Sequence, residues 1–218
     1  MKKPAILIII AILLVSVSRA QNLTDNKQVI NDSAAVSSVT SAINTVDLPF
    51  FASSSDAEKI VAGIMDAIGL EGNFKIKMAH VPNVEATIKH HERYILYNPE
   101  FVTQVNSVTK NKWASIFILA HEVGHHVEGH TIADVKSSPE IELQADQFAG
   151  FVLCKMGATL QDAQLAMHYI SNIEASKTHP GRADRLAAIE KGWDKAEAQM
   201  EGLSFNSNTL SQTTASQN

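Results

Sequence analysis

The stretch IFILAHEVGHHV (residues 116–127) decides the fold of this chain of 218 residues. Apolar side chains occupy most of its positions, which predicts a central, buried helix that begins near Asn111. His121 and His125 are four residues apart, so on that helix they lie on one face, one turn from each other. Burying two histidines and Glu122 costs free energy unless something binds them. The stretch therefore indicates a binding site inside the core.

The spacing of the two histidines is typical of a metal site. It lets both imidazoles reach one Zn²⁺ ion at about 2.0–2.1 Å while the helix fixes their separation. Glu122 lies beside the first histidine and can reach a water at the metal without binding the metal itself. Zinc lowers the pKa of such a water towards about 7, and a carboxylate can take its proton as the water attacks a carbonyl. The motif predicts a hydrolase that uses one zinc ion, with Glu122 as the base.

A hydrolytic zinc site needs a third protein ligand and one open position. Three of the nearby side chains fit this role poorly. His126 lies more than a quarter turn away from the ligand face. Gly129 and His130 are each displaced by one residue from the positions that the metzincin pattern requires. Glu140 opens the following helix, where a carboxylate favours the helix N-terminus.

Glu142 fits the third position best. It begins the sequence Glu142-Leu143-Gln144-Ala145-Asp146, which places Glu142 and Asp146 on one helical face. We expect Glu142 to bind the ion and Asp146 to accept a hydrogen bond from the distal nitrogen of a ligand histidine. Such a partner fixes the tautomer of the histidine and strengthens it as a ligand. The small side chain of Ala145 allows the two helices to approach closely.

Composition limits the other classes of function. Hydrophobic residues make up 45% of the chain and charged residues 19%, as in a soluble globular domain. The formal charge of −5 gives no electrostatic footprint for nucleic acid. Cys154 is the only cysteine, which excludes an intrachain disulfide and a cysteine-based zinc site. Its apolar neighbours predict a buried, inert thiol.

The N-terminus has the pattern of a signal peptide. Residues 1–20 combine a basic start with an apolar run and the small residues of Ser18-Arg19-Ala20. The apolar run is shorter than the roughly 20 residues of a membrane span. We expect cleavage after Ala20 and a secreted or periplasmic protein, with membrane contact only if the segment stays as an uncleaved anchor.

The rest of the chain divides into three parts. We predict a polar linker or leader over residues 21–47, a folded domain over residues 48–200 and a disordered polar tail over residues 201–218. Periodicity and capping residues predict the elements of the folded domain. These are a helix capped within Ser53-Ser54-Ser55 and running to about Ile68, a strand over 73–80, a hairpin of 84–90 and 92–97 closed near His90-His91, and helices from Pro99 to about Val105, from Asn111, from Ser138 to Met156, from Thr159 to about Ala175 and from Pro180 to near Gln199.

These residues resemble the gluzincin metallopeptidases, and within them the HtpX and CaaX-prenyl-protease-like group with its soluble, minimal relatives. The resemblance covers roughly residues 92–190 and rests on LAHEVGHH (119–126), ELQADQFA (142–149) and Thr178-His179-Pro180, with Arg185 six residues after the histidine. It implies a zincin-like fold with one Zn²⁺ ion. It implies His121, His125 and Glu142 as ligands, Glu122 as the base and Asp146 behind a ligand histidine.

The resemblance also implies roles outside the metal site. His179 would help to hold the oxyanion, and Arg185 would brace the site from the last helix, with Arg182 as its rival. One strand would be the edge strand beside which a peptide adds, unless it pairs only within the sheet; its residues are Arg93, Tyr94, Ile95, Leu96 and Tyr97.

We therefore expect a zincin-like α+β domain, mainly helical, with a small β-sheet beside the central metal-binding helix. The expected function is hydrolysis of peptide bonds in soluble proteins or peptides, because no membrane helices follow the leader. Two alternatives stay open: hydrolysis of another amide, as in a deformylase, and a non-catalytic zinc-binding or partner-binding module. An intact Glu122 argues against the second, since a structural site has no use for a base.

Overall fold

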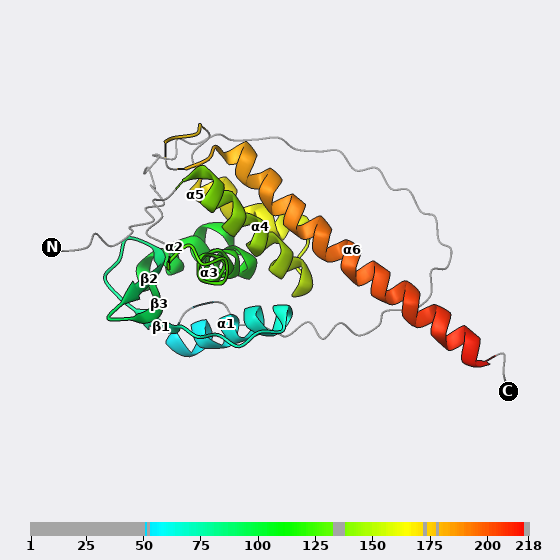
Figure 1. Cartoon of the computed structure of the whole chain (residues 1–218). Helices are drawn as coiled ribbons and strands as arrows, with labels where there is room; N and C mark the ends of the chain where they lie inside the picture. Colours follow the sequence, from blue (N-terminus) through cyan, green and yellow to red (C-terminus); the bar gives the residue numbers. More distant parts are fainter. Residues whose placement is uncertain (1–50, 52, 133–137, 172–173, 178, 216–218) are drawn as a thin grey trace.

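The computed structural model describes residues 51, 53–132, 138–171, 174–177 and 179–215. This part of the chain forms six helices and three strands (Figure 1). In chain order they are α1 (Ser54–Ile68), β1 (Lys75–Met78), β2 (Val84–Lys89), β3 (Glu92–Tyr97), α2 (Pro99–Thr109), α3 (Lys112–Val127), α4 (Pro139–Lys155), α5 (Leu160–Ile170) and α6 (Arg182–Ala215). The mainly helical α+β class expected from the sequence is confirmed.

Short polar side chains begin the helices where the sequence predicts them. Ser53 accepts from the backbone N–H of Asp56, whose carboxylate accepts from Ser53 in return, so a capping box opens α1. Thr159 and Asp162 form the same arrangement at the start of α5. Gly69 ends α1 with a φ of 70°, which glycine adopts without strain. These caps satisfy backbone groups that the ends of a helix leave unpaired.

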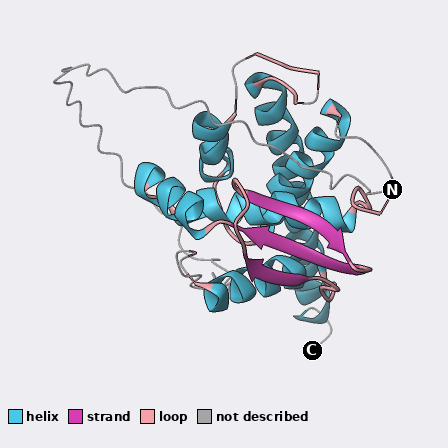
Figure 2. Ribbon diagram, turned by 90° about the vertical axis from the view of Figure 1, so that its left-hand side faces the viewer, coloured by secondary structure: helices cyan, strands magenta, loops and turns pink. Residues whose placement is uncertain are grey.

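The sheet has the order β1-β3-β2. His90 and His91 both have positive φ, as a two-residue type I′ turn requires, and they close the predicted hairpin of β2 and β3. β1 adds to the free side of β3 in parallel. Figure 2 shows the three strands lying flat in front of the helices.

β3 is the middle strand, so the expectation that Arg93, Tyr94, Ile95, Leu96 and Tyr97 form an edge strand is wrong. Both sides of β3 are hydrogen-bonded, and no peptide can add to it. Periodicity predicts a strand but does not show which of its sides is paired. Among the described strands, the edges are β1 and β2.

α3 lies at the centre of the domain. Every residue from Ala114 to His126 is buried, which agrees with the broad apolar stripe seen in the sequence. Gly124 allows α4 to approach closely, because a Cβ at this position would lie 3.3 Å from the Cα of Ala145. This approach brings the side chain of Glu142 on α4 against the ligand histidines of α3.

α4 and α6 also pack closely, and glycines make this possible. A Cβ at Gly150 would lie 2.1 Å from the carbonyl oxygen of Ile189, and one at Gly192 would lie 1.9 Å from that of Gln147. Neither position has room for a side chain, so the two helix backbones are in direct contact. The start of α6 is thereby held against the helix that carries Glu142.

Three helices end at other residues than the sequence predicts. α2 continues past Val105 to Thr109, and α5 ends at Ile170, because Ser171 has an extended backbone. α6 runs from Arg182 to Ala215, past the predicted end near Gln199 and into the residues expected to form the polar tail. Residues 203–215 contain neither glycine nor proline, so nothing in their backbone chemistry ends the helix.

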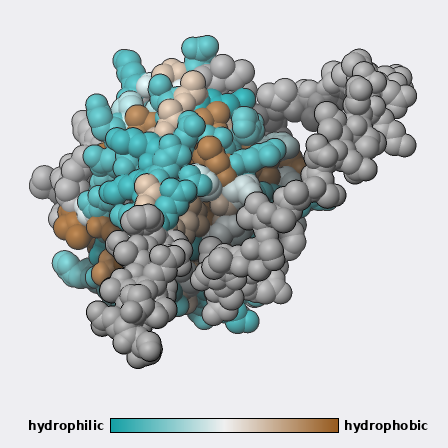
Figure 3. All heavy atoms as spheres, turned by 90° about the vertical axis from the view of Figure 1, so that its right-hand side faces the viewer, coloured by the Kyte–Doolittle hydropathy of each residue, from teal (hydrophilic) through white to brown (hydrophobic). Residues whose placement is uncertain are grey.

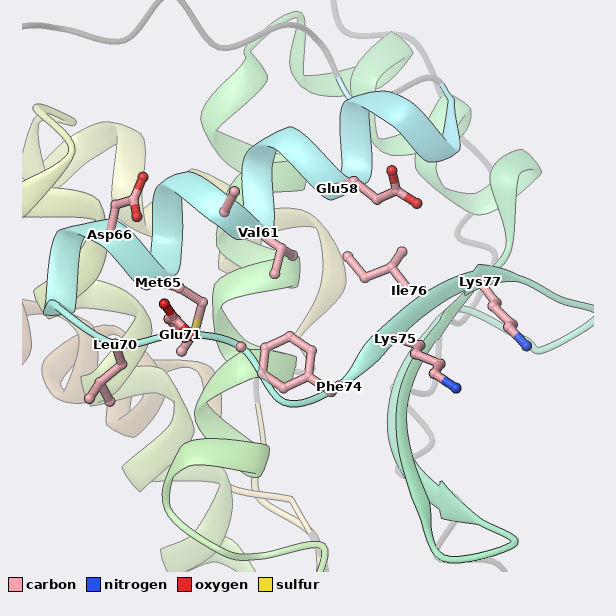
Figure 4. A pocket seen from close by; sticks show the side chains of 12 residues that line it. Glu58, Val61, Met65, Asp66, Leu70, Glu71, Phe74, Lys75, Ile76 and Lys77 are labelled. Atoms are coloured by element: carbon pink, nitrogen blue, oxygen red, sulfur yellow. The ribbon is translucent and has the colours of Figure 1, made fainter.

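A groove of about 620 Å³ separates α1 from β1. Figure 4 shows Val61 and Met65 on α1, Ile76 on β1 and Phe74 directly before that strand. None of its lining residues belongs to the predicted metal site. On the face seen in Figure 3, hydrophilic side chains predominate over scattered hydrophobic ones. Among the described residues, no helix is both long and apolar enough to cross a membrane.

The contact between α4 and α6 gives a test of the packing. Gly192→Ala should lower the free energy of unfolding by about 2–3 kcal/mol, because its new methyl group overlaps a backbone oxygen. Gly202→Ala, on the same helix, is the matched control: no atom lies within 4 Å of its Cβ, and stability should rise by up to about 1 kcal/mol. Urea denaturation of both variants measures the difference, and equal stabilities would contradict the packing described.

Candidate metal centre

The three predicted ligands come together. His121 and His125 lie on α3 and Glu142 lies on α4, and one ligand atom from each lies within 4.8 Å of the others. The two Nε2 atoms are 3.1 Å apart, and Nε2 of His121 is 3.4 Å from Oε2 of Glu142. All three side chains are buried. This group could hold a metal ion, as the sequence predicts.

Asp146 is placed behind the first histidine, as expected. Its Oδ1 is 2.9 Å from Nδ1 of His121, so the other ring nitrogen of His121 is left for the metal. Arg185 of α6 donates to both carboxylate oxygens of Asp146, at 2.6 and 2.7 Å. Its rival Arg182 instead bonds Ser171, at 2.7 Å to the carbonyl oxygen. The structure thus places Arg185 against the site.

The second histidine has a partner that the sequence does not predict. Nδ1 of His125 is 3.0 Å from Nδ1 of His130, and Nε2 of His130 is 2.8 Å from Oε1 of Gln144. The spacing of His130 does not match the metzincin pattern, and the sequence predicts no other role for this residue. The signal that could have found it is its place just after the end of α3, where the chain turns back.

Glu122 is fully buried beside the ligands. Its Oε2 accepts a hydrogen bond of 2.7 Å from the backbone N–H of Ala86 on β2. Its Oε1 has no hydrogen-bond partner among the described residues. Burial raises the pKa of this carboxyl to about 8 in the metal-free protein. A buried oxygen without a partner is costly, and a bound ion with its water would relieve that cost.

The ligands differ in their charge. Burial lowers the pKa of His121, but the hydrogen bonds of Asp146 and Glu142 outweigh it and raise that pKa to about 9. Burial and the charge of His121 lower the pKa of His125 to about 3. Burial would raise the pKa of Glu142, but His121 outweighs it and lowers that pKa to about 2. At neutral pH, His121 is therefore positively charged, His125 is a neutral imidazole and Glu142 is an ionised carboxylate.

His126 is buried, and its ring bonds the sheet and the turn after α3. Its Nε2 is 2.9 Å from the carbonyl oxygen of Tyr94, and its Nδ1 is 3.0 Å from the hydroxyl of Thr131. Its ring stacks on Phe74, and Arg93 donates to its backbone carbonyl. These contacts attach the end of α3 to β3, so the residues of β3 help to position the helix that carries His121 and His125.

The other residues singled out in the sequence lie apart from the ligand group or stay untested. Glu140 accepts from the hydroxyl of Ser138 at the start of α4. Cys154 is a buried free thiol, and burial raises its pKa to about 11, which agrees with an inert side chain. The backbone N–H of His179 donates to the hydroxyl of Ser176. Its expected role at an oxyanion stays a prediction.

Two imidazoles and one carboxylate are a donor set that Zn²⁺ accepts in catalytic sites. The residues present fit such an ion, because the donors converge, each histidine has a partner on its distal nitrogen, and Glu122 keeps a free oxygen. No protein-family model, curated protein or solved structure matches the chain. The case for the site therefore rests on this geometry.

Metal binding should release protons. A divalent ion must displace the proton of His121, whose pKa is raised to about 9, so affinity should increase with pH between 7 and 9. His121 alone gives a slope of about one logarithmic unit of affinity per pH unit, and the slope should be steeper below about pH 8, where the cation also ionises Glu122. Calorimetric titration in two buffers with different ionisation enthalpies counts the protons released, and an affinity that is constant over this range would contradict the protonation described.

The pair of Asp146 and Arg185 should matter for stability. Arg185→Ala removes the guanidinium that donates to both oxygens of the buried Asp146 carboxylate, leaves that carboxylate with the imidazolium of His121, and should cost about 3–5 kcal/mol. Arg182→Ala, three residues earlier on α6, removes bonds to Ser171 and should cost about 1 kcal/mol. Thermal and urea unfolding of the metal-free variants compare the two. Equal losses of unfolding free energy would contradict a larger contribution of the buried pair to stability.

Proposed function

We propose that the protein is a zinc-dependent peptidase of the gluzincin type. The observation that carries the proposal is the convergence of His121, His125 and Glu142 within 4.8 Å, with the buried carboxylate of Glu122 beside them. A purely structural zinc site is usually closed by four protein ligands, whereas catalytic sites use three and keep one position open. Three ligands and an adjacent base match the catalytic pattern.

A zinc ion bound in this group would supply Lewis acidity towards water and a carbonyl oxygen. Glu122 provides the proton acceptor, because its Oε1 is free while the N–H of Ala86 holds Oε2. Its raised pKa belongs to the metal-free protein, and a nearby cation favours the ionised carboxylate. Glu122 can therefore accept a proton and pass it to a leaving amine.

The sheet supports a peptide as the substrate. The N–H of Asn98 donates to the carbonyl of Asn83, so these two residues form a hydrogen-bonded pair. Along the antiparallel strands β2 and β3, hydrogen-bonded pairs alternate with pairs that are not hydrogen-bonded. By that alternation the backbone groups of Val84, Ala86 and Ile88 point away from β3. The N–H of Ala86 does so, since it reaches Glu122. A peptide extended along the outer edge of β2 would pass the base.

The proposed place of action is outside the cytoplasm. It rests on residues 1–20, whose signal-peptide pattern lies outside the described part of the chain. Soluble proteins or peptides are the proposed substrates.

Glu122→Gln tests the proposed reaction. It keeps the size of the side chain and its acceptor oxygen but removes the base, so peptide cleavage should fall by about 10²-fold or more while the metal stays bound. Metal analysis and digestion of a broad peptide library compare the variant with wild type. Zinc bound by both proteins with cleavage by neither would favour a non-catalytic module, and cleavage of formylated amides alone would favour a deformylase.

A further inference from the structure

A chain of hydrogen bonds leads from the metal centre back to the helix that supplies Glu142. It runs from Nδ1 of His125 to Nδ1 of His130 over 3.0 Å, and from Nε2 of His130 to Oε1 of Gln144 over 2.8 Å. We propose that His130 is a positioning residue that fixes the tautomer of His125 for metal binding, with Gln144 fixing His130 in turn. This inference rests on the proposed metal site.

The direction of these hydrogen bonds follows from Gln144, the last residue of the series. The amide oxygen of Gln144 can only accept a hydrogen bond, so Nε2 of His130 must donate. In a neutral imidazole the other nitrogen then accepts, so Nδ1 of His130 receives the proton of Nδ1 of His125. Nε2 of His125 is left with its lone pair. That atom is the one that faces Nε2 of His121 across 3.1 Å.

The backbone brings His130 to this position. Gly129 has a φ of 77°, which turns the chain back at the end of α3. Its N–H donates to the carbonyl of His126, and its own carbonyl accepts from Ile132 at 3.0 Å. The rings of His125 and His130 then meet edge to face with centroids 5.2 Å apart. The turn is thus built to return an imidazole to the ligand.

The two ligand histidines have different partners. His121 bonds the carboxylate of Asp146, which strengthens it as a metal ligand, whereas His125 bonds a second imidazole ring. An imidazole nitrogen that accepts orients the ligand and sets the place of its proton without adding a negative charge. The role of His130 should therefore depend on having an acceptor atom near Nδ1 and not on the size of the ring.

Metal affinity of the full chain tests the proposal, with chelator competition for Zn²⁺ and the visible absorption of bound Co²⁺ as readouts. His130→Phe keeps a ring without an acceptor and should weaken binding by about 10–100-fold and alter the Co²⁺ bands. His130→Asn keeps an oxygen near the position of Nδ1 and should stay within about threefold of wild type. Gln144→Leu, at an exposed position, should weaken binding by about fivefold. His168→Phe, at an exposed position on α5, is the matched control and should change nothing.

The outcomes separate this inference from the proposed function. Wild type that binds no metal overturns both. Wild type that binds zinc, with His130→Phe and Gln144→Leu each within about twofold of it, overturns the positioning role and leaves the peptidase proposal standing. If His130→Phe does not fold, Gln144→Leu decides. Equal losses in His130→Phe and His130→Asn would show a structural role and would also overturn the inference.

Discussion

The carboxylate of Asp146 joins three helices, and the candidate metal centre depends on it. Asp146 belongs to α4, bonds His121 of α3 and accepts two bonds from Arg185 of α6. All three side chains are buried, so each charge needs its partner. The same carboxylate therefore holds the first ligand in its tautomer and fixes α6 against the core. Stability and the proposed metal binding therefore depend on the same interaction.

Close backbone packing makes that interaction possible. Gly124 lets α4 approach α3, and Gly150 and Gly192 let α6 approach α4. The ligands are then carried by rigid elements, which hold a site more precisely than loops do. Within the described residues, the turn at Gly129 adds a loop residue, His130, to the surroundings of the ligands.

The sequence predicts the parts of this structure that depend on local chemistry. Helix caps such as Ser53 and Thr159 follow from hydrogen bonds within four residues. That His121 and His125 share one face of α3 follows from helical spacing, and the choice of Glu142 follows from its place one turn before Asp146 on the following helix. The order of the strands does not follow, because it depends on how β1 meets β3 in space. The contact of His130 with His125 does not follow from the sequence for a similar reason. It depends on the backbone conformation of the turn at Gly129, which residue spacing does not describe.

The most direct test of the metal centre is anomalous diffraction at the zinc edge from crystals of the zinc-loaded protein. We predict one strong peak about 2.0–2.2 Å from Nε2 of His121, Nε2 of His125 and a carboxylate oxygen of Glu142. A peak bound by other residues, or no peak at this group in protein that carries zinc, would contradict the metal centre proposed for this chain.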